Sequence, residues 1–123
     1  MAVSRTKLLD SLRRLQRVRR RLLRRLTQDH ELAVGSVSLV RRKCGNSSCH
    51  CAHGPGHLQT LFLFKDNGQR RCKLVRRADE ARLHQAGKHY REFREDIKQL
   101  RAIDRREKEI LMALRDLRAI HYK

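Results

Sequence analysis

Residues 43–57 read KCGNSSCHCAHGPGH and contain three of the four cysteines of the chain, three of its seven histidines and its only proline. Thiolates and imidazoles this close together, separated by small and turn-forming residues, are typical of a metal site, and zinc is the metal that such ligands usually hold. Buried free thiols rarely occur in a segment with so few large apolar residues, and a disulfide is typical of a secreted chain. The spacing therefore predicts a structural zinc ion.

Four protein ligands are expected for a structural zinc ion, with no open coordination position. Cys44, Cys49 and Cys51 are the expected first three ligands. His57 is the preferred fourth ligand, because the residues 54–56 (Gly-Pro-Gly) before it form a flexible turn that can bring the chain back toward the metal.

Three other residues are alternatives for the fourth position. Cys72 is the second choice, because it would contribute a soft ligand from a later part of the chain. His50 would point away from its two cysteine neighbours if that segment is extended, since adjacent side chains alternate sides. His53 would require a very tight loop.

Catalysis by this metal is not expected. A hydrolytic zinc needs an exchangeable water and a nearby general base, usually a carboxylate, and residues 32–65 contain no Asp or Glu. The His-x-Glu signature of zinc deaminases, a Walker-type glycine loop and a nucleophile elbow are also absent from the sequence. We expect a protein that is not an enzyme.

The charge of the chain indicates a polyanionic partner. The 123 residues include 31 Lys and Arg against 13 Asp and Glu, which gives a formal net charge of +18. Residues 1–31, 32–76 and 77–123 contribute +7, +7 and +4. Because neutralising phosphates releases condensed counterions, nucleic acid is the expected partner.

The first segment is predicted to form an amphipathic helix over residues 7–26. Its apolar residues recur with a period of about 3.5, at Leu8, Leu12, Leu15, Leu22 and Leu26, with Leu9, Val18 and Leu23 widening the stripe. The opposite face carries eight arginines that repel one another unless an external anion separates them; they are Arg13, Arg14, Arg17, Arg19, Arg20, Arg21, Arg24 and Arg25.

The middle segment has the pattern of a small antiparallel sheet. Residues 36–40 and 61–64 are expected strands, and Asp66-Asn67-Gly68 supplies turn residues before a further strand at 71–75. Because two strands alone are marginally stable in water, the hairpin needs a third strand from residues 36–43 or a metal ion.

The last segment is predicted to be a helix that begins near Asp79 and Glu80 and exceeds about thirty residues. Gly87 is expected to kink or break it near its start, since glycine costs about 1 kcal/mol in a helix interior. The apolar stripe runs through Leu83, Ala86, Tyr90, Phe93, Ile97, Leu100, Ile103, Ile110, Leu114 and Leu117. Part of it, between residues 103 and 120, is expected to need cover from a second copy of the chain or from a partner protein.

The simplest architecture is one structural domain of the α+β class. We expect a long antiparallel helical hairpin with a small zinc-stapled antiparallel β module between the helices. Its three segments are residues 1–31, a basic amphipathic helix; residues 32–76, the β module with the metal-binding loop; and residues 77–123, the long helix.

Residues 35–45, the Cys49-x-Cys51 pair, the Gly54-x-Gly56-His57 motif and the following hairpin resemble a group of short, largely uncharacterised bacterial proteins often encoded near transposases. The resemblance covers residues 33–76, although Leu58-Gln59-Thr60 replaces the Gly-Pro and aromatic residues usual in that group. It implies a metal site at Cys44, Cys49, Cys51 and His57 with Cys72 at a variable position, and an association with mobile elements and with DNA or RNA.

The leading hypothesis is a non-catalytic, zinc-containing protein that binds structured RNA or duplex DNA through phosphates, as part of a ribonucleoprotein or mobile-element complex. Few exposed aromatic residues are expected, which argues against stacking on single strands as the main mode. The expected contacts are Arg13, Arg14, Arg17, Arg20, Arg21, Arg24, Arg25, Arg41, Arg42, Lys43, Arg70, Arg71 and Lys73.

The alternative hypothesis is an adaptor whose long C-terminal helix binds a transposase or a similar protein partner; a homodimer is a further possibility. No apolar segment precedes Ser4 and no long apolar run occurs, so a cytoplasmic location with no membrane contact is expected, in association with the nucleoid or a ribonucleoprotein.

Overall fold

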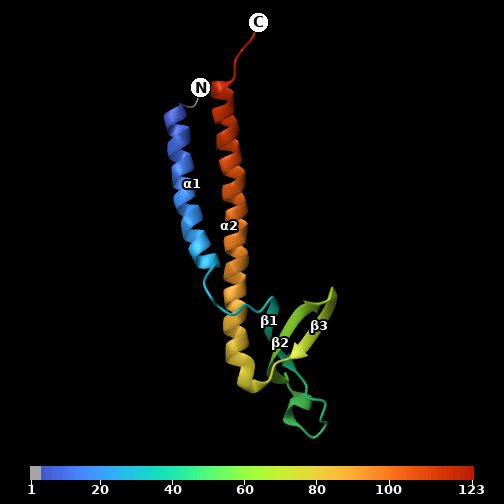
Figure 1. Ribbon diagram of the computed structural model, residues 1–123. Helices are drawn as coiled ribbons and strands as arrows, with labels where there is room; N and C mark the ends of the chain where they lie inside the picture. Colours follow the sequence, from blue (N-terminus) through green and yellow to red (C-terminus); the bar gives the residue numbers. More distant parts are fainter. Residues whose placement is uncertain (1–3) are drawn as a thin grey trace. The chain divides into compact units, whose positions relative to one another are not determined.

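The computed structural model describes residues 4–123, so residues 1–3 of the expected first segment lie outside the described part of the chain. The protein belongs to the α+β class, as predicted, with two helices and a small antiparallel sheet (Figure 1). The elements are α1 (Arg5–Leu26), β1 (Gly35–Arg42), η1 (His50–His53), β2 (His57–Asp66), β3 (Gln69–Leu74), η2 (Arg77–Asp79) and α2 (Glu80–Arg118).

The chain divides into two compact units, and α2 contributes to both of them. The helical unit combines the residues up to Asp29 with Phe93–Lys123, and the sheet unit is His30–Glu92. These boundaries differ from those of the three expected segments, because the first part of α2 packs with the strands.

Helix α1 begins two residues earlier than the predicted helix because Ser4 caps it. The Ser4 side chain accepts a hydrogen bond from the backbone N–H of Lys7 at 3.2 Å, which satisfies one of the unpaired donors of the first turn. At the other end, the Thr27 hydroxyl donates to the Leu23 carbonyl at 2.7 Å. Two cations, Arg24 and Arg25, occupy the last turn, where they interact favourably with the helix dipole.

In the helical unit, α1 is joined to α2 by a small apolar core and by ion pairs. Leu8, Leu22, Ile103 and Ile110 are its buried apolar residues among those described, and Ile110 is completely inaccessible to solvent. Arg19 binds Asp104 and, at 3.1 Å, Glu107, while Arg25 lies 2.8 Å from Asp96. Since the partner numbers on α2 fall as those on α1 rise, the two helices are antiparallel in this unit.

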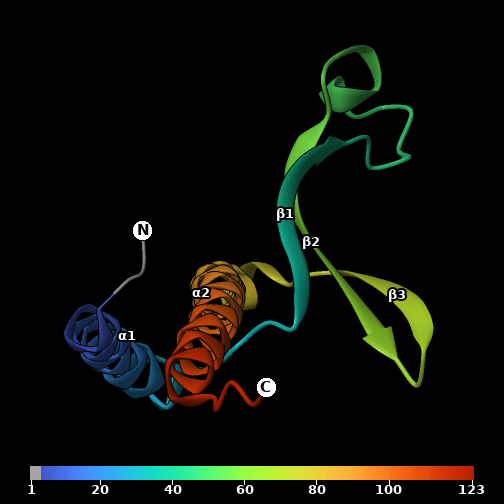
Figure 2. The same cartoon turned by 90° about the horizontal axis from the view of Figure 1, so that it is seen from above.

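The sheet has the strand order β1-β2-β3, and both pairings are antiparallel (Figure 2). The third strand expected from residues 36–43 is therefore confirmed as β1. The β2–β3 turn consists of Asn67 and Gly68 with φ of 51° and 79°, the pair of positive φ angles that a two-residue type I′ turn requires. In Figure 2 the loop that carries η1 lies at the end of β1 and β2, away from this turn.

One face of the sheet packs on the first turns of α2. Thr60 is completely buried there, with its hydroxyl 2.9 Å from Nε2 of His84, and the N–H of Ala33 donates to the Ala86 carbonyl at 3.0 Å. The expectation that the helix breaks at Gly87 is wrong, because α2 runs unbroken from Glu80 to Arg118. A Cβ atom at Gly87 would lie 3.1 Å from the side chain of Val37, so glycine serves here to let a strand approach the helix.

Candidate metal centre

Four side chains of the sheet unit converge at the end of β1 and β2. The ligand atoms of Cys44, Cys49, Cys51 and His57 all lie within 4.8 Å of one another. Cys44 follows the end of β1 by two residues. Cys49 is the N-cap of η1, and Cys51 lies within η1. His57 is the first residue of β2. The ladder brings the two strand ends together, because Arg42 pairs with His57 in register.

The spacing within this cluster fits one metal ion. Sγ of Cys44 and Sγ of Cys51 are 3.5 Å apart, and Sγ of Cys49 is 3.3 Å from Nε2 of His57. A tetrahedron built with metal–ligand bonds of zinc length has S–S edges of about 3.8 Å and S–N edges of about 3.6 Å. A disulfide would need about 2.05 Å between sulfurs, and all four cysteines of the chain are free. These four residues could therefore hold a metal ion.

The surroundings of the cluster lower the pKa of the Cys44 thiol and raise the pKa of the Cys51 thiol. A backbone hydrogen bond from Asn46, together with side-chain hydrogen bonds from Cys51 and Cys49, lowers the pKa of Cys44. For Cys51, the N–H of Cys44 favours the thiolate, but burial and the neighbouring sulfurs of Cys44 and Cys49 outweigh it and raise the pKa. Because like charges this close oppose one another, a cation is the natural counterpart of several thiolates here.

Asn46 organises the turn that leads into η1, and the sequence analysis did not single it out. Its side-chain oxygen accepts hydrogen bonds from the N–H of Ser48 at 3.0 Å and from the Ser48 hydroxyl at 2.7 Å, while its backbone carbonyl accepts from the N–H of Cys49 at 3.0 Å. The sequence signal for this turn is an Asn followed two residues later by a donor, the pattern of an Asx turn.

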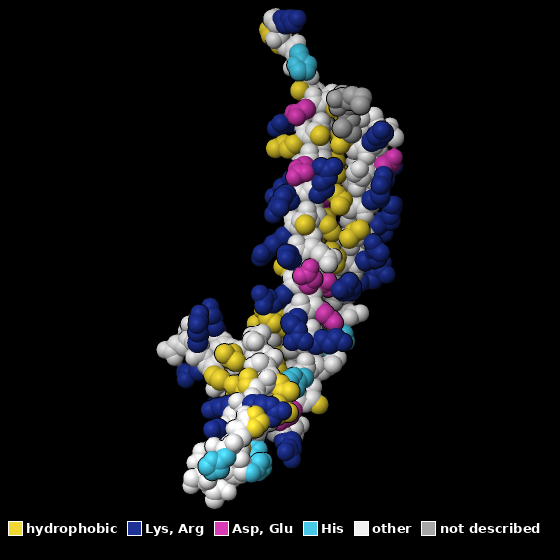
Figure 3. All heavy atoms as spheres, turned by 180° about the vertical axis from the view of Figure 1, so that it is seen from behind, with side chains coloured by type: hydrophobic (Ala, Val, Ile, Leu, Met, Phe, Trp, Pro, Cys, Tyr) yellow, Lys and Arg dark blue, Asp and Glu magenta, His cyan; other side chains and the backbone are white. Residues whose placement is uncertain are grey.

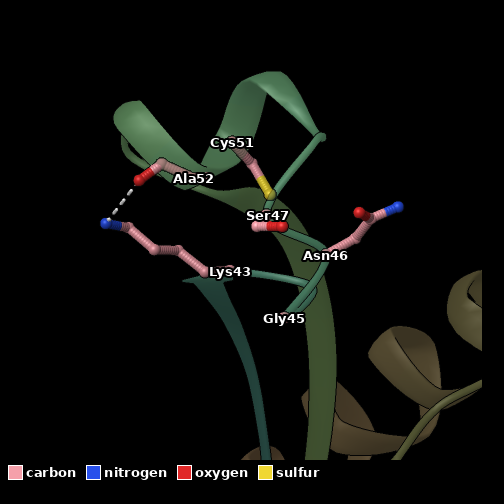
Figure 4. A pocket seen from close by; sticks show the side chains of 6 residues that line it. All are labelled: Lys43, Gly45, Asn46, Ser47, Cys51 and Ala52. Carbon is pink, nitrogen blue, oxygen red and sulfur yellow. Dashed lines mark hydrogen bonds between the residues drawn. The ribbon is translucent and has the colours of Figure 1, made fainter.

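Two of the expected nucleic-acid contacts donate hydrogen bonds to carbonyl groups of the metal loop. Nζ of Lys43 donates to the Ala52 carbonyl at 3.1 Å, and Nη1 of Arg41 donates to the Gly56 carbonyl at 3.4 Å. The stem of Lys43 also forms one wall of a cavity of about 150 Å³ beside the cluster (Figure 4). The residues that line this cavity are Lys43, Gly45, Asn46, Ser47, Cys51 and Ala52.

Gly56 is required by the close approach of two backbone segments just before His57. Its φ is +88°, and a Cβ atom there would lie 2.7 Å from both the carbonyl carbon and the oxygen of Arg42. The turn expected at residues 54–56 therefore requires glycine at position 56, because of its positive φ and because of the close approach of the Arg42 backbone.

The other three candidates for the fourth ligand lie outside the four-residue cluster in the described part of the chain. Cys72 pairs in register with Leu63, six residues along β2 from His57, which corresponds to about 20 Å of strand. Nδ1 of His50 is 4.0 Å from Sγ of Cys49, and its ring contacts the His57 ring edge-on at a centroid distance of 5.4 Å. His53 ends η1.

The arginines of α1 fall into two groups. Arg19 and Arg25 bind acidic residues of α2, as described above, and Arg13 lies 3.6 Å from Asp10 of its own helix. No ion pair between residues 4 and 123 involves the remaining five, which are Arg14, Arg17, Arg20, Arg21 and Arg24. The last four of these surround a hollow of about 410 Å³, and Figure 3 shows basic side chains in a row along α1.

The remaining expected contacts are exposed residues of the sheet. Arg42 ends β1 beside the metal loop, and Arg70, Arg71 and Lys73 belong to β3, in which every residue is exposed. Nη2 of Arg71 donates to the side chain of Gln69 at 3.4 Å. The basic residues of the sheet unit are thus divided between the end that carries the metal loop and the hairpin that carries β3.

Comparison with known proteins adds one assignment. None of the helices in the described part of the chain is both long and apolar enough to cross a membrane. No curated protein and no solved structure matches the sequence. A family profile described as a domain of unknown function, DUF6788, matches residues 12–85, more than half of the chain, and the protein therefore belongs to the DUF6788 family.

Proposed function

We propose that this protein is a non-catalytic, zinc-stabilised protein that binds nucleic acid through phosphate groups. The observation that carries the proposal is the division of the α1 arginines. Those that face α2 are neutralised by Asp96, Asp104 and Glu107, whereas those on the opposite side have no acidic partner on α2 among the described residues.

Arginines with no ion pair to α2 form a continuous surface on α1, and Arg13 alone among them has an acidic neighbour, Asp10 of the same helix. With about 100° of rotation per residue, Arg13, Arg14, Arg17, Arg20, Arg21 and Arg24 lie within an arc of about 120° on the helix. The buried residues Leu8 and Leu22 lie on the opposite side. We call these six residues the arginine face.

An external anion is the physical counterpart of the arginine face. Guanidinium groups one helical turn apart repel one another, and a helix with this charge is stabilised when phosphates lie between them. Phosphodiester binding also releases condensed counterions, which favours affinity that does not depend on sequence. Structured RNA and duplex DNA both offer phosphates at this density.

The metal centre has a structural role in this proposal. Three thiolates and one imidazole complete a tetrahedral zinc site and leave no position for a reactive water. Residues 32–65 supply no carboxylate as general base. The zinc ion would hold the ends of β1 and β2 together, and the protein would act in the cytoplasm within a ribonucleoprotein or a mobile-element complex.

The arginine face can be tested by comparing two variants of equal net charge. The quadruple variant R17Q/R20Q/R21Q/R24Q removes the four positive charges that line the hollow on α1. The control R91Q/K98Q/R101Q/R105Q removes four exposed positive charges of α2. Binding of labelled duplex RNA and duplex DNA is measured by fluorescence anisotropy over a series of salt concentrations.

We expect the first variant to reduce the slope of log K against log salt by about 3 to 4, since each lost phosphate contact on duplex DNA contributes about 0.9. The control should change the slope much less. Equal effects of the two variants would show that only net charge matters, and an unchanged slope in the first variant would contradict the proposal.

Exposed apolar residues near the end of α2 favour a second candidate function, an adaptor for a transposase-like protein or a second copy of the chain. Leu111 and Met112 are each 53% exposed and Leu117 is 48% exposed. Loss of a co-purifying protein from L111S/M112S/L117S, with nucleic-acid affinity unchanged, would favour this function.

A further inference from the structure

Two of the three phenylalanines of the chain lie together on one face of the sheet. Phe62 and Phe64 are two residues apart on β2, so their side chains point to the same side. Their rings are stacked, with centroids 4.9 Å apart and an interplanar angle of 24°. Neither residue is buried, although both are large and aromatic.

Basic residues lie directly across from these rings. In the β2–β3 register Lys73 pairs with Phe62 and Arg71 pairs with Phe64, and residues paired in this way share a face of the sheet. On the other side of β2, Phe64 pairs with Gly35, which has no side chain to cover the ring.

Helix α2 covers only part of this face. Two of its contacts with the face are at Thr60, through His84, and at Val37, through Gly87. Thr60 is completely buried, whereas Phe64, further along β2 toward the turn at Asn67, is only partly buried. The aromatic pair therefore lies where the cover by the helix ends.

We propose that Phe62, Phe64, Arg71 and Lys73 form a binding site for two unpaired nucleotides of a single-stranded segment. Aromatic faces on a sheet stack on bases, and the neighbouring cations bind the phosphates that join those bases. An apolar protein segment would have no use for Arg71 and Lys73 beside the rings, and no acidic residue lies among the four. This inference rests on the proposed function and makes the ligand more specific.

The site changes the expected form of the nucleic acid. Stacking on single strands was not expected to be the main mode because the chain has only three Phe, two Tyr and no Trp. The fold, however, places two of these few rings side by side and partly open to solvent. A ligand with unpaired bases, as in the loops of structured RNA, would use this site.

The test compares single-stranded and duplex ligands with variants that keep apolar volume. F62L/F64L removes the aromatic faces, F62Y/F64Y retains them, and L63A alters a residue that is 44% exposed on the opposite face of β2. Zinc-loaded full-length proteins are titrated against short single-stranded RNA that contains 2-aminopurine, whose fluorescence is quenched by stacking, and against duplex RNA. F64L alone is measured as well, in case the double variant does not fold.

We expect F62L/F64L to weaken single-strand binding by about 5- to 150-fold per ring and to abolish the quenching, because each base loses its stacking on an aromatic side chain. F62Y/F64Y and L63A should retain single-strand affinity and quenching. The affinity for duplex RNA should be unchanged in all of these variants. F64L should give a smaller loss in the same direction.

Retained quenching in F62L/F64L, quenching in F64L equal to that of the wild type, or an equal loss of single-strand and duplex affinity would overturn the inference. Unchanged single-strand affinity would also overturn it and leave the arginine face standing. A wild-type protein that binds neither ligand would instead contradict the proposed function itself. Competition by an apolar peptide, with no effect of RNA, would identify the face as a protein-docking site and contradict the inference.

Discussion

Arg25 and Asp96 form an ion pair in which the carboxylate is almost completely buried. Nη2 of Arg25 lies 2.8 Å from Oδ1 of Asp96, and the side chains are 58% and 4% exposed. The oxygen accepts no hydrogen bond within residues 4–123, so the guanidinium group approaches it without directing an N–H bond at it. The guanidinium charge is therefore what compensates for burying this carboxylate.

Replacing Arg25 should therefore destabilise the helical unit, although Arg25 belongs to the set expected to bind nucleic acid. We expect R25Q to lower the free energy of unfolding by about 2 kcal/mol, less than the 3–5 kcal/mol typical of fully buried pairs because the arginine is half exposed. The neighbouring variant R24Q is the matched control, since Arg24 has no acidic partner among the described residues.

R24Q should change stability by less than about 0.5 kcal/mol and weaken nucleic-acid binding. Chemical denaturation measures the first property and fluorescence anisotropy the second. Equal stabilities of R24Q and R25Q would show that the Arg25–Asp96 pair does not stabilise the helical unit.

Removing the metal should unfold the sheet unit, which has few buried residues of its own. We expect one zinc ion per chain by elemental analysis, and a chelator should lower the melting temperature, because free metal at a thousand times Kd stabilises by about 4 kcal/mol. C49S should lose the metal, while C72S should retain it because Cys72 lies on β3 outside the cluster. Zinc loss in C72S but not in C49S would contradict the ligand set.

Gly56 and Gly54 offer a matched pair for testing the turn before His57. In G56A the new methyl group would lie 2.7 Å from the backbone of Arg42, whereas in G54A the nearest atom is 3.7 Å away. We expect G56A to weaken zinc affinity by about tenfold or more, as loss of a supporting contact around a metal does. G54A should bind normally. Zinc competition with a chromophoric chelator gives both affinities, and equal values would exclude the steric explanation.

The contact between Gly87 and Val37 predicts a measurable coupling. An alanine at 87 gains about 1 kcal/mol in helix propensity but pushes on Val37, whose side chain would be 3.1 Å from the new Cβ. G87A should therefore stabilise the protein less in the presence of Val37 than in a V37A background. A double-mutant cycle should give a coupling energy of about 0.5–1 kcal/mol. Additive effects would show that the strand is free to move away from the helix.

Elements with strong local signals were predictable from the sequence. The apolar period gave α1 to within two residues, and Asn67-Gly68 gave the hairpin turn, because the required positive φ angles restrict the residue types. The start of α2 was predicted at its observed residue, Glu80. The continuity of α2 through Gly87 was not predicted. The cost of glycine in a helix is small, and a tertiary contact such as that with Val37 outweighs it.

The candidate site was predictable in part because its ligands lie close together in the sequence. Spacing grouped Cys44, Cys49 and Cys51, and it made His57 the preferred fourth residue with Cys72 as the alternative; the fold brings His57 to the three cysteines. The roles of Arg41 and Lys43 could not be predicted, because their partners are backbone carbonyl groups that any residue could supply. The sequence around a basic residue is the same whether its side chain donates to a carbonyl group of the protein or binds an external ligand.

The local sequence by itself determined the helices, the hairpin turn, the excess of positive charge and the three cysteines of the metal cluster, since each depends on neighbours within a few residues. Only the tertiary structure decided which arginines are neutralised by Asp96, Asp104 and Glu107, which face of β2 carries the accessible Phe62 and Phe64, and why Gly87 belongs in a helix. These features depend on contacts between residues far apart in the chain, and a local pattern of charge or hydrophobicity does not specify its partner.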